Sequence, residues 1–186
     1  MNVNPTAAAV IDACETIGAD HMVTGAFAFN CYGIPRSTKD FDLVVDVSKT
    51  SISPLIRHLD GAVEFGQQVQ FDTLTWGRRH IGQSKLEPGF VVELFELFDD
   101  RFVMESFRRR QRLHSVQLDR DIWLPTAEDV IVQKLRWGRP KDLEDARDVT
   151  AVQGPENLDT TYIERWCAEH GSSDRWTSLL ESLPPL

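Results

Sequence analysis

The chain has 186 residues, of which 41% are hydrophobic and 26% charged, and its formal net charge at pH 7 is −9. This composition is typical of a globular protein and excludes global disorder, and a chain of this length can bury a core without disulfides or a structural metal. The acidic total does not support a main role in holding duplex nucleic acid, because such proteins usually carry a basic face and a basic total charge.

The cysteines and the apolar segments indicate the compartment. Cys14, Cys31 and Cys167 are widely spaced and form no CxxC pair, which argues against a disulfide framework or a zinc ribbon. The N-terminal residues lack the basic and apolar segments of a secretory signal, and no apolar stretch approaches the roughly 20 residues that span a bilayer. We therefore expect a cytoplasmic protein without a membrane segment.

Short helices and strands are predicted to alternate over the first two thirds of the chain. Asn4 before Pro5 predicts a helix start and Gly18 its end. Alternating apolar and acidic residues predict a strand over 40–47. The other predicted elements are a strand over 21–24, a helix from Gly25 to Tyr32, a loop over 34–39, a helix over 52–59, two or three short strands between 63 and 81, a strand over 90–97, a helix over 99–110 and a strand over 113–118.

The last third of the chain has a helical pattern. Thr126 predicts a helix start and Gly138 its end, and Pro140 begins the next helix. Two more helices are predicted over 161–169 and 173–183. We expect an α+β (α/β) core over residues 1–122 and a helical region over residues 123–186 that packs on it.

Two aspartates separated by one residue lie in the strand predicted over 40–47. Side chains of a strand alternate between its faces, so Asp40 and Asp42 project from one face while Phe41 points into the core. Two convergent carboxylates are ligands for a hard cation, and magnesium favours a few carboxylates together with substrate phosphates and water. The pair therefore predicts a site for Mg²⁺ or Mn²⁺. The alternative is a solvated acidic face, and Asp46 on the same face fits that alternative.

A third acid, Glu93, lies within the apolar strand predicted over 90–97. Burying a lone acid is costly unless it is paired, hydrogen-bonded or bound to a metal. If this strand lies beside the Asp40 strand, Glu93 completes a three-carboxylate site that can hold two metal ions and orient or deprotonate a hydroxyl nucleophile. A simple ion pair between Glu93 and an arginine is the alternative.

One ordered set of residues resembles the polymerase-beta-type nucleotidyltransferase superfamily: Gly25, Arg36, Thr38, Asp40, Asp42 and Glu93. The closest likeness is to its small prokaryotic members, which include toxin-like proteins of abortive-infection systems. The likeness extends to a helix carrying Lys134 and the Arg-Pro-Lys-Asp turn over 139–142, and it covers residues 20–150. It implies a nucleotidyltransferase-like mixed β-sheet flanked by helices, with the catalytic core over residues 1–122.

The resemblance also implies an activity. It implies Mg²⁺- or Mn²⁺-dependent transfer of a nucleoside monophosphate from a nucleoside triphosphate to a hydroxyl of RNA, protein or a small molecule. Catalytic and metal-binding roles fall on Asp40, Asp42 and Glu93. A glycine turn that opens a helix receives phosphates on its first amides. The residues that would contact the nucleotide are Gly25, Ala26, Arg36, Thr38 and Lys134. For a toxin-like member, a cognate antitoxin protein is the implied partner.

Several of these positions also have an ordinary structural interpretation. Gly25 can be a strand-to-helix turn, Arg36 a surface loop residue and Lys134 a solvated helix residue. The arginines over 108–112 fit a basic helix end better than an RNA-binding patch. The alternative function is a noncatalytic nucleotide- or protein-binding module with the same fold, because Ala26 stands where the family usually has a second glycine or a serine.

Overall fold

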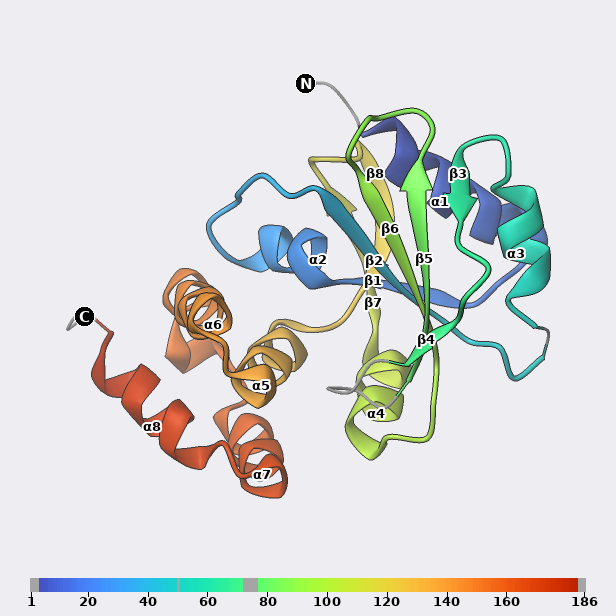
Figure 1. Ribbon diagram of the computed structural model, residues 1–186. Helices are drawn as coiled ribbons and strands as arrows, with labels where there is room; N and C mark the ends of the chain where they lie inside the picture. Colours follow the sequence, from blue (N-terminus) through green and yellow to red (C-terminus); the bar gives the residue numbers. More distant parts are fainter. Residues whose placement is uncertain (1–3, 50, 72–76, 184–186) are drawn as a thin grey trace.

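A computed structural model describes residues 4–49, 51–71 and 77–183 (Figure 1). Its helices are α1 (Pro5–Ile17), α2 (Gly25–Tyr32), α3 (Ser53–His58), α4 (Arg101–Arg109), α5 (Ala127–Trp137), α6 (Pro140–Gln153), α7 (Thr160–His170) and α8 (Ser173–Glu181), with a 3-10 turn η1 (Pro155–Asn157) between α6 and α7. Its strands are β1 (His21–Thr24), β2 (Asp40–Val45), β3 (Val63–Phe65), β4 (Gln70–Phe71), β5 (Arg78–Ser84), β6 (Val91–Glu96), β7 (Gln111–Ser115) and β8 (Arg120–Leu124).

The main sheet is mixed, which confirms the α+β fold expected from the sequence. Its strand order is β1-β2-β6-β5-β3, and β4 also pairs with β5. The central pair β2 and β6 is parallel, whereas the other pairs are antiparallel. The pairing of β2 with β6 brings the two acidic segments of the sequence onto neighbouring strands.

Alternation along β2 and β6 divides the two faces of the sheet. Phe41, Leu43, Val92 and Leu94 are fully buried in the main hydrophobic core. The residues between them face the other side, where helices α2 and α5 lie (Figure 1). The apolar set anchors the strands, and the alternate set is left to line a cavity.

Local signals determine the helix ends as predicted. The Asn4 side chain accepts a hydrogen bond from the Ala7 amide, and Gly18 ends α1 with φ +67°. At α5, Thr126 and Asp129 form a reciprocal capping box. These caps satisfy amides that a helix start leaves without partners.

The structure corrects the prediction at the end of the core. The strand predicted over 113–118 is confirmed over residues 113–115, but it ends at Ser115, because residues 116–119 form a tight turn between β7 and β8. Asp119 adopts φ +49° in that turn, a conformation that aspartate tolerates better than most residues. β8 spans Arg120–Leu124 and pairs antiparallel with β7. The division of the chain at residue 122 stays a prediction.

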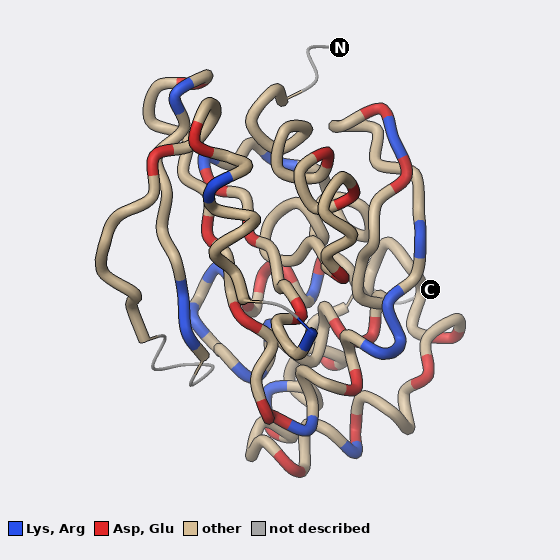
Figure 2. Tube along the Cα trace, turned by 90° about the vertical axis from the view of Figure 1, so that its right-hand side faces the viewer, with Lys and Arg blue, Asp and Glu red and all other residues tan. Residues whose placement is uncertain are grey.

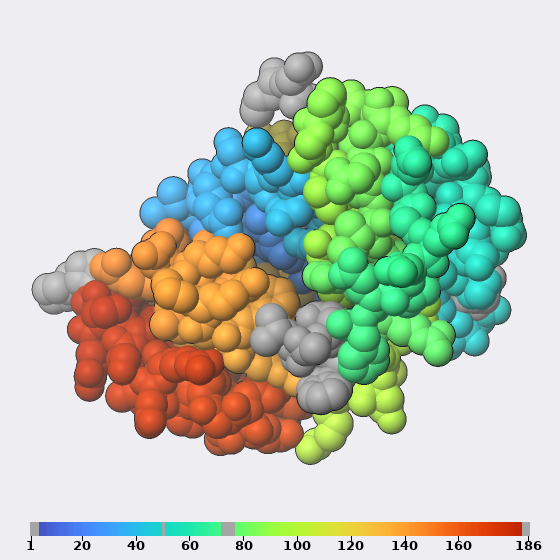
Figure 3. Space-filling model, viewed as in Figure 1, coloured from blue at the N-terminus to red at the C-terminus, as the bar shows by residue number. Residues whose placement is uncertain are grey.

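The helical segment α5–α8 forms one side of the molecule, in orange and red, beside the blue α2 and the green β5 and β6 (Figure 3). Acidic and basic residues are interspersed along the trace (Figure 2).

Of the strands predicted between 63 and 81, β3, β4 and the start of β5 are present, and residues 72–76 lie outside the described residues. None of the described helices has the length and apolarity that a membrane span requires.

Candidate active site

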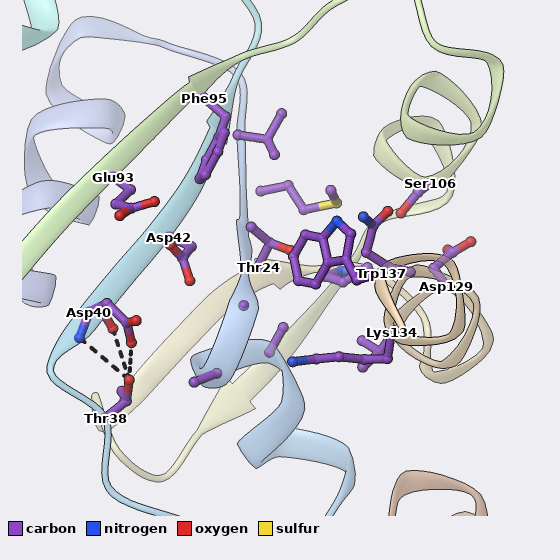
Figure 4. Close-up of a pocket in the computed structure, with 18 of the residues that line it drawn as sticks. Thr24, Thr38, Asp40, Asp42, Glu93, Phe95, Ser106, Asp129, Lys134 and Trp137 are labelled. Atoms are coloured by element: carbon purple, nitrogen blue, oxygen red, sulfur yellow. Dashed lines mark hydrogen bonds between the residues drawn. The ribbon is translucent and has the colours of Figure 1, made fainter. Parts of the chain in front are cut away.

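Three strands align polar residues in one row across the sheet. Thr24 at the end of β1 is the register partner of Asp42 in β2, and Asp42 is the register partner of Glu93 in the parallel strand β6. Asp40 lies two residues before Asp42 on the same face. Figure 4 shows Asp40, Asp42 and Glu93 on the same side of the two strands. The condition set by the sequence, that the Glu93 strand lies beside the Asp40 strand, is met.

The row lines a cavity of about 430 Å³ between the sheet, α2, α4 and α5. All eight residues predicted for the site from the sequence line this cavity: Gly25, Ala26, Arg36, Thr38, Asp40, Asp42, Glu93 and Lys134. They come from segments up to 109 residues apart in the chain, and the fold gathers them in one place. Their chemical roles stay predictions.

Position 25 requires a glycine for two reasons, its own backbone conformation and the space that the Asp42 side chain occupies. Its φ is +61°, in the left-handed region that favours glycine. A Cβ at this position would lie 1.8 Å from Asp42 Oδ2, so only glycine leaves room for the carboxylate. Gly25 also begins α2, and the preceding Thr24 makes no side-chain hydrogen bond to cap that helix. First-turn amides of α2 therefore donate no hydrogen bond to the usual capping side chain.

The carboxylates of Asp40 and Asp42 are partly buried and close to each other. The hydroxyl of Thr38 donates to Asp40 Oδ1. Burial, and after it the neighbouring charges of Asp40 and Glu93, raise the pKa of Asp42 to about 7. Lys134 and Lys141 act against this rise, but they are too weak to cancel it. The sheet side of the cavity therefore carries negative charge that its surroundings do not balance.

Glu93 has a basic neighbour that sequence reasoning did not identify. Arg79 of β5 lies with Nη1 3.2 Å from Glu93 Oε2 and also donates to Gln70. The alternative interpretation of Glu93, an ion pair with an arginine, is therefore present. Alternation along β5 could have placed Arg79 on the cavity face, but which acid it meets depends on strand order.

Oxygen donors of this kind suit Mg²⁺ or Mn²⁺, and the excess negative charge around Asp42 is what a cation would offset. Over residues 4–49, 51–71 and 77–183, however, no group of three His, Cys, Asp or Glu side chains is gathered closely enough to hold a metal ion. The observed arrangement thus fits a cation held by Asp40 and Asp42 together with ligand oxygens. The part of Glu93 in metal binding stays a prediction.

The helical side of the cavity is built on a buried ion-pair network. Lys134 of α5 is only 5% exposed, so its interpretation as a solvated helix residue is wrong. Its Nζ lies 2.6 Å from Asp145 Oδ2 and 3.3 Å from Asp142 Oδ1. Arg36 forms two hydrogen bonds with Asp145, and Arg139 forms two with Asp142. In these contacts two buried carboxylates hold three cations, from α5 and from the loops before β2 and α6.

Hydrogen bonds determine the ionisation of Asp145 in this network. Burial alone would raise the pKa of Asp145, but hydrogen bonds from Arg36 and Lys134 hold it below its ordinary value. The network also joins the loop after α2 to α5 and α6. The sequence pointed to Lys134, Arg36 and the turn that contains Asp142, whereas the ion pairs of Asp142 and Asp145 with these cations were not predicted.

The arginines over 108–112 lie at and just after the end of α4. Arg108 and Arg109 are in its last turn, as the interpretation of a basic helix end predicts, whereas Arg110 follows the helix and Arg112 lies in β7. Each approaches a carboxylate: Arg108 pairs with Glu105, Arg109 approaches Asp129, Arg110 pairs with Asp20 and Arg112 with Glu15.

No protein-family model matches the chain, and no curated protein matches it in sequence. Several solved structures, however, match the chain in fold. The solution structure of the antibiotic-resistance factor ANT(2'')-Ia superposes with a TM-score of 0.61 at 11% identity, covering 95% of this chain and 94% of that one. A crystal structure of ANT(2'')-Ia in complex with adenylyl-2''-tobramycin gives 0.61 at 13% identity, covering 88% and 94%. An antigenic nucleotidyltransferase-like protein from Paracoccidioides brasiliensis gives 0.55 at 16%, covering 97% and 94%.

These similarities extend over nearly the whole chain and over nearly the whole of each matched protein. The chain therefore has the nucleotidyltransferase-like fold, as the resemblance in the sequence implied. At this level of identity the likeness defines the fold alone, and the activity has to be argued from the site.

Proposed function

We propose that the protein is a divalent-cation-dependent nucleotidyltransferase, which transfers a nucleoside monophosphate from a nucleoside triphosphate to a hydroxyl acceptor. One observation carries the proposal: the predicted catalytic and nucleotide-binding residues line one cavity, with Asp42 and Glu93 in register across two parallel strands. A solvated acidic strand would not bring these residues together.

The triphosphate would lie between the start of α2 and the basic network. The first amides of α2 at Gly25 and Ala26 are suited to phosphate oxygens. Arg36 and Lys134 contribute positive charge on the helical side of the cavity. Lys134 would act through its field, because its ammonium already contacts two aspartates.

Asp40 and Asp42 would hold the cation, with triphosphate oxygens completing its coordination. When bound, the cation offsets charge on the phosphoryl oxygens and on the departing pyrophosphate. The protein contributes the position of both carboxylates, since the glycine at position 25 leaves space for Asp42.

In the transfer step, the acceptor oxygen forms a bond to the α-phosphorus while the bond from that phosphorus to the pyrophosphate oxygen breaks. The proton of the acceptor hydroxyl passes to a carboxylate, for which Glu93 is the best-placed residue. Arg79 would hold Glu93 in position on the sheet.

The acceptor belongs to the same proposal. RNA, a protein or a small molecule can each supply the hydroxyl, and a toxin–antitoxin role with an antitoxin partner in the cytoplasm follows from the family resemblance. Adenylyl-2''-tobramycin is bound by ANT(2'')-Ia, which favours including small hydroxylated compounds among the acceptors tested.

The test is transfer of label from each of four α-labelled triphosphates with magnesium, offered cell RNA, cell protein and small-molecule acceptors. The variant Asp40→Asn/Asp42→Asn should lose transfer by roughly a thousandfold or more. Asp60→Asn, whose side chain is 87% exposed far from the cavity lining, is the matched control and should keep it. Equal transfer by both variants would reject the assigned site.

A noncatalytic nucleotide-binding module is the second candidate, and the ion pair between Arg79 and Glu93 favours it. A module would be stabilised against heat by magnesium and a triphosphate, because the ligand binds only the folded state, yet it would transfer no label. The enzyme would do both.

A further inference from the structure

The floor of the cavity changes character along the strands. One row contains Thr24, Asp42 and Glu93. Two residues further along, a second row contains Met22, Val44 and Phe95, which are also register partners across β1, β2 and β6. Two residues of a strand span about 7 Å. The cavity therefore has an acidic half and an apolar half, and the two rows are about 7 Å apart, which leaves room for a sugar ring between them.

The walls of the apolar half are aromatic. This half is lined by Phe98 in the loop before α4, by Phe102 of α4 and by Trp137 of α5. With Phe95 on the floor, aromatic side chains surround this half from three elements, and Figure 4 shows Phe95 and Trp137 on its two sides. Such a surface favours a flat apolar group by burial and by ring stacking.

Polar groups without protein partners also line the apolar half. Ser106 of α4 is 5% exposed and Gln133 lies on the adjacent face of α5. The buried indole Nε1 of Trp137 makes no hydrogen bond. Within the described part of the chain, neither Ser106 Oγ nor the Gln133 amide has a hydrogen-bond partner. Buried polar groups normally have partners, so the unpaired indole of Trp137, beside the open hydroxyl of Ser106 and the half-buried amide of Gln133, indicates a ligand with donors and acceptors on its edge.

The charges of this half exclude a polycation. Its carboxylate is Asp129, whose side chain has 0% exposure and receives hydrogen bonds from Tyr162 and Thr126. Arg79, the cation at its border, is paired with Glu93. An amine-rich ligand would find no accessible carboxylate here, whereas an uncharged ring would lose no ionic contact.

We propose that this apolar half, lined by Met22, Val44, Phe95, Ser106, Gln133 and Trp137, binds the base of the donor nucleotide. The inference rests on the proposed function, because the phosphates of the same molecule would lie at the acidic half. Aromatic and aliphatic side chains contact the faces of the ring. The Ser106 hydroxyl and the Gln133 amide hydrogen-bond its edge and thereby select among bases.

The test compares two ligands that differ only in whether they carry a nucleoside. Calorimetry with magnesium measures the binding of inorganic tripolyphosphate and of nonhydrolysable triphosphates with each of the four bases. Wild-type protein should bind at least one nucleotide about tenfold more tightly than tripolyphosphate. Equal affinity for all five ligands would overturn the inference even if every variant were unfolded.

Variants then locate the contact. Ser106→Ala and Gln133→Leu should each weaken the preferred nucleotide by roughly three- to tenfold, the loss expected for one hydrogen bond, and leave tripolyphosphate unchanged. Ser178→Ala and Gln83→Leu, at exposed positions away from the cavity, should change neither. Unaltered nucleotide affinity in both cavity variants, or equal weakening of tripolyphosphate, would overturn the inference.

The outcomes separate this inference from the proposed function. If neither tripolyphosphate nor any nucleotide binds with magnesium, the proposed function fails. If both bind but the cavity variants behave as wild type, the function stands and the base lies elsewhere.

Discussion

The two sides of the cavity handle charge differently. On the helical side, Lys134, Asp142 and Asp145 are buried but form ion pairs with one another and with flanking arginines. On the sheet side, Asp40 and Asp42 lie together without an ion pair to any basic side chain of the described residues, and the pKa of Asp42 rises to about 7. Charge that a protein balances internally contributes to its structure, whereas charge left unbalanced in a cavity indicates a ligand.

Removing a charge from the helical side tests whether the balanced ion pairs there stabilise the fold, and it should cause the largest loss of stability. Lys134→Met leaves Asp142 and Asp145 buried with fewer partners, so the free energy of unfolding should fall by about 3 kcal/mol. Urea unfolding measures this change. Lys141→Met, at an exposed position of the neighbouring helix, should stay within about 0.5 kcal/mol of the wild type. A comparable loss in both variants would contradict the structural role of the network.

Removing a charge from the sheet side should raise the free energy of unfolding instead of lowering it. The folded-state pKa of Asp42 is raised above 3.8 to about 7, so the folded state binds the extra proton, and the unliganded protein loses stability as pH rises from about 4 to about 7. At pH 8 without metal, Asp42→Asn should therefore be more stable than wild type by up to about 4 kcal/mol. The gain should shrink towards zero near pH 4. Thermal or urea unfolding across this range measures it, and a variant less stable at pH 8 would contradict the account.

A smaller effect separates backbone conformation from the space that Asp42 needs. Gly25 and Gly18 both have positive φ, but a Cβ at Gly18 meets nothing within 4 Å. Gly18→Ala should cost about 1 kcal/mol from conformation alone. Gly25→Ala should cost about 1 kcal/mol more, because its methyl displaces the Asp42 carboxylate, and should also abolish label transfer. Equal stability losses with transfer retained would remove Gly25 from the site.

The smallest effect concerns the partly exposed pair of Arg79 and Glu93, with side-chain exposures of 27% and 21%. Such pairs contribute less than about 1 kcal/mol. If the arginine competes with a cation for Glu93, Arg79→Gln should bind Mn²⁺ a few-fold more tightly, as measured by electron paramagnetic resonance. Weaker Mn²⁺ binding would instead mean that Arg79 supports the metal site.

The sequence predicted most of this arrangement where the signal was local. The caps at Asn4 and Thr126, the breaks at Gly18 and Gly138, and the alternation around Phe41 each follow from neighbouring residues. The pairing of Asp42 with Glu93 was predicted only as a condition, because strand order is a long-range property.

What the sequence did not predict depends on tertiary contacts. Arg79 pairs with Glu93, and Lys134 pairs with two aspartates. In each case several other charged side chains of the chain could have been the partner, and only the tertiary fold decides which one is. The turn that separates β7 from β8 was missed for another reason, since Asp119 takes a positive φ without a glycine or proline to mark it.

The central claim, that Asp40 and Asp42 leave charge for a cation-bound triphosphate, is tested most directly by calorimetry with a nonhydrolysable triphosphate. Wild-type protein should bind it with magnesium and only weakly in excess chelator. Asp40→Asn/Asp42→Asn should lose the magnesium-dependent part, whereas Asp46→Asn, just beyond the end of β2, should keep it. Magnesium-dependent binding that survives in the double variant would contradict the claim.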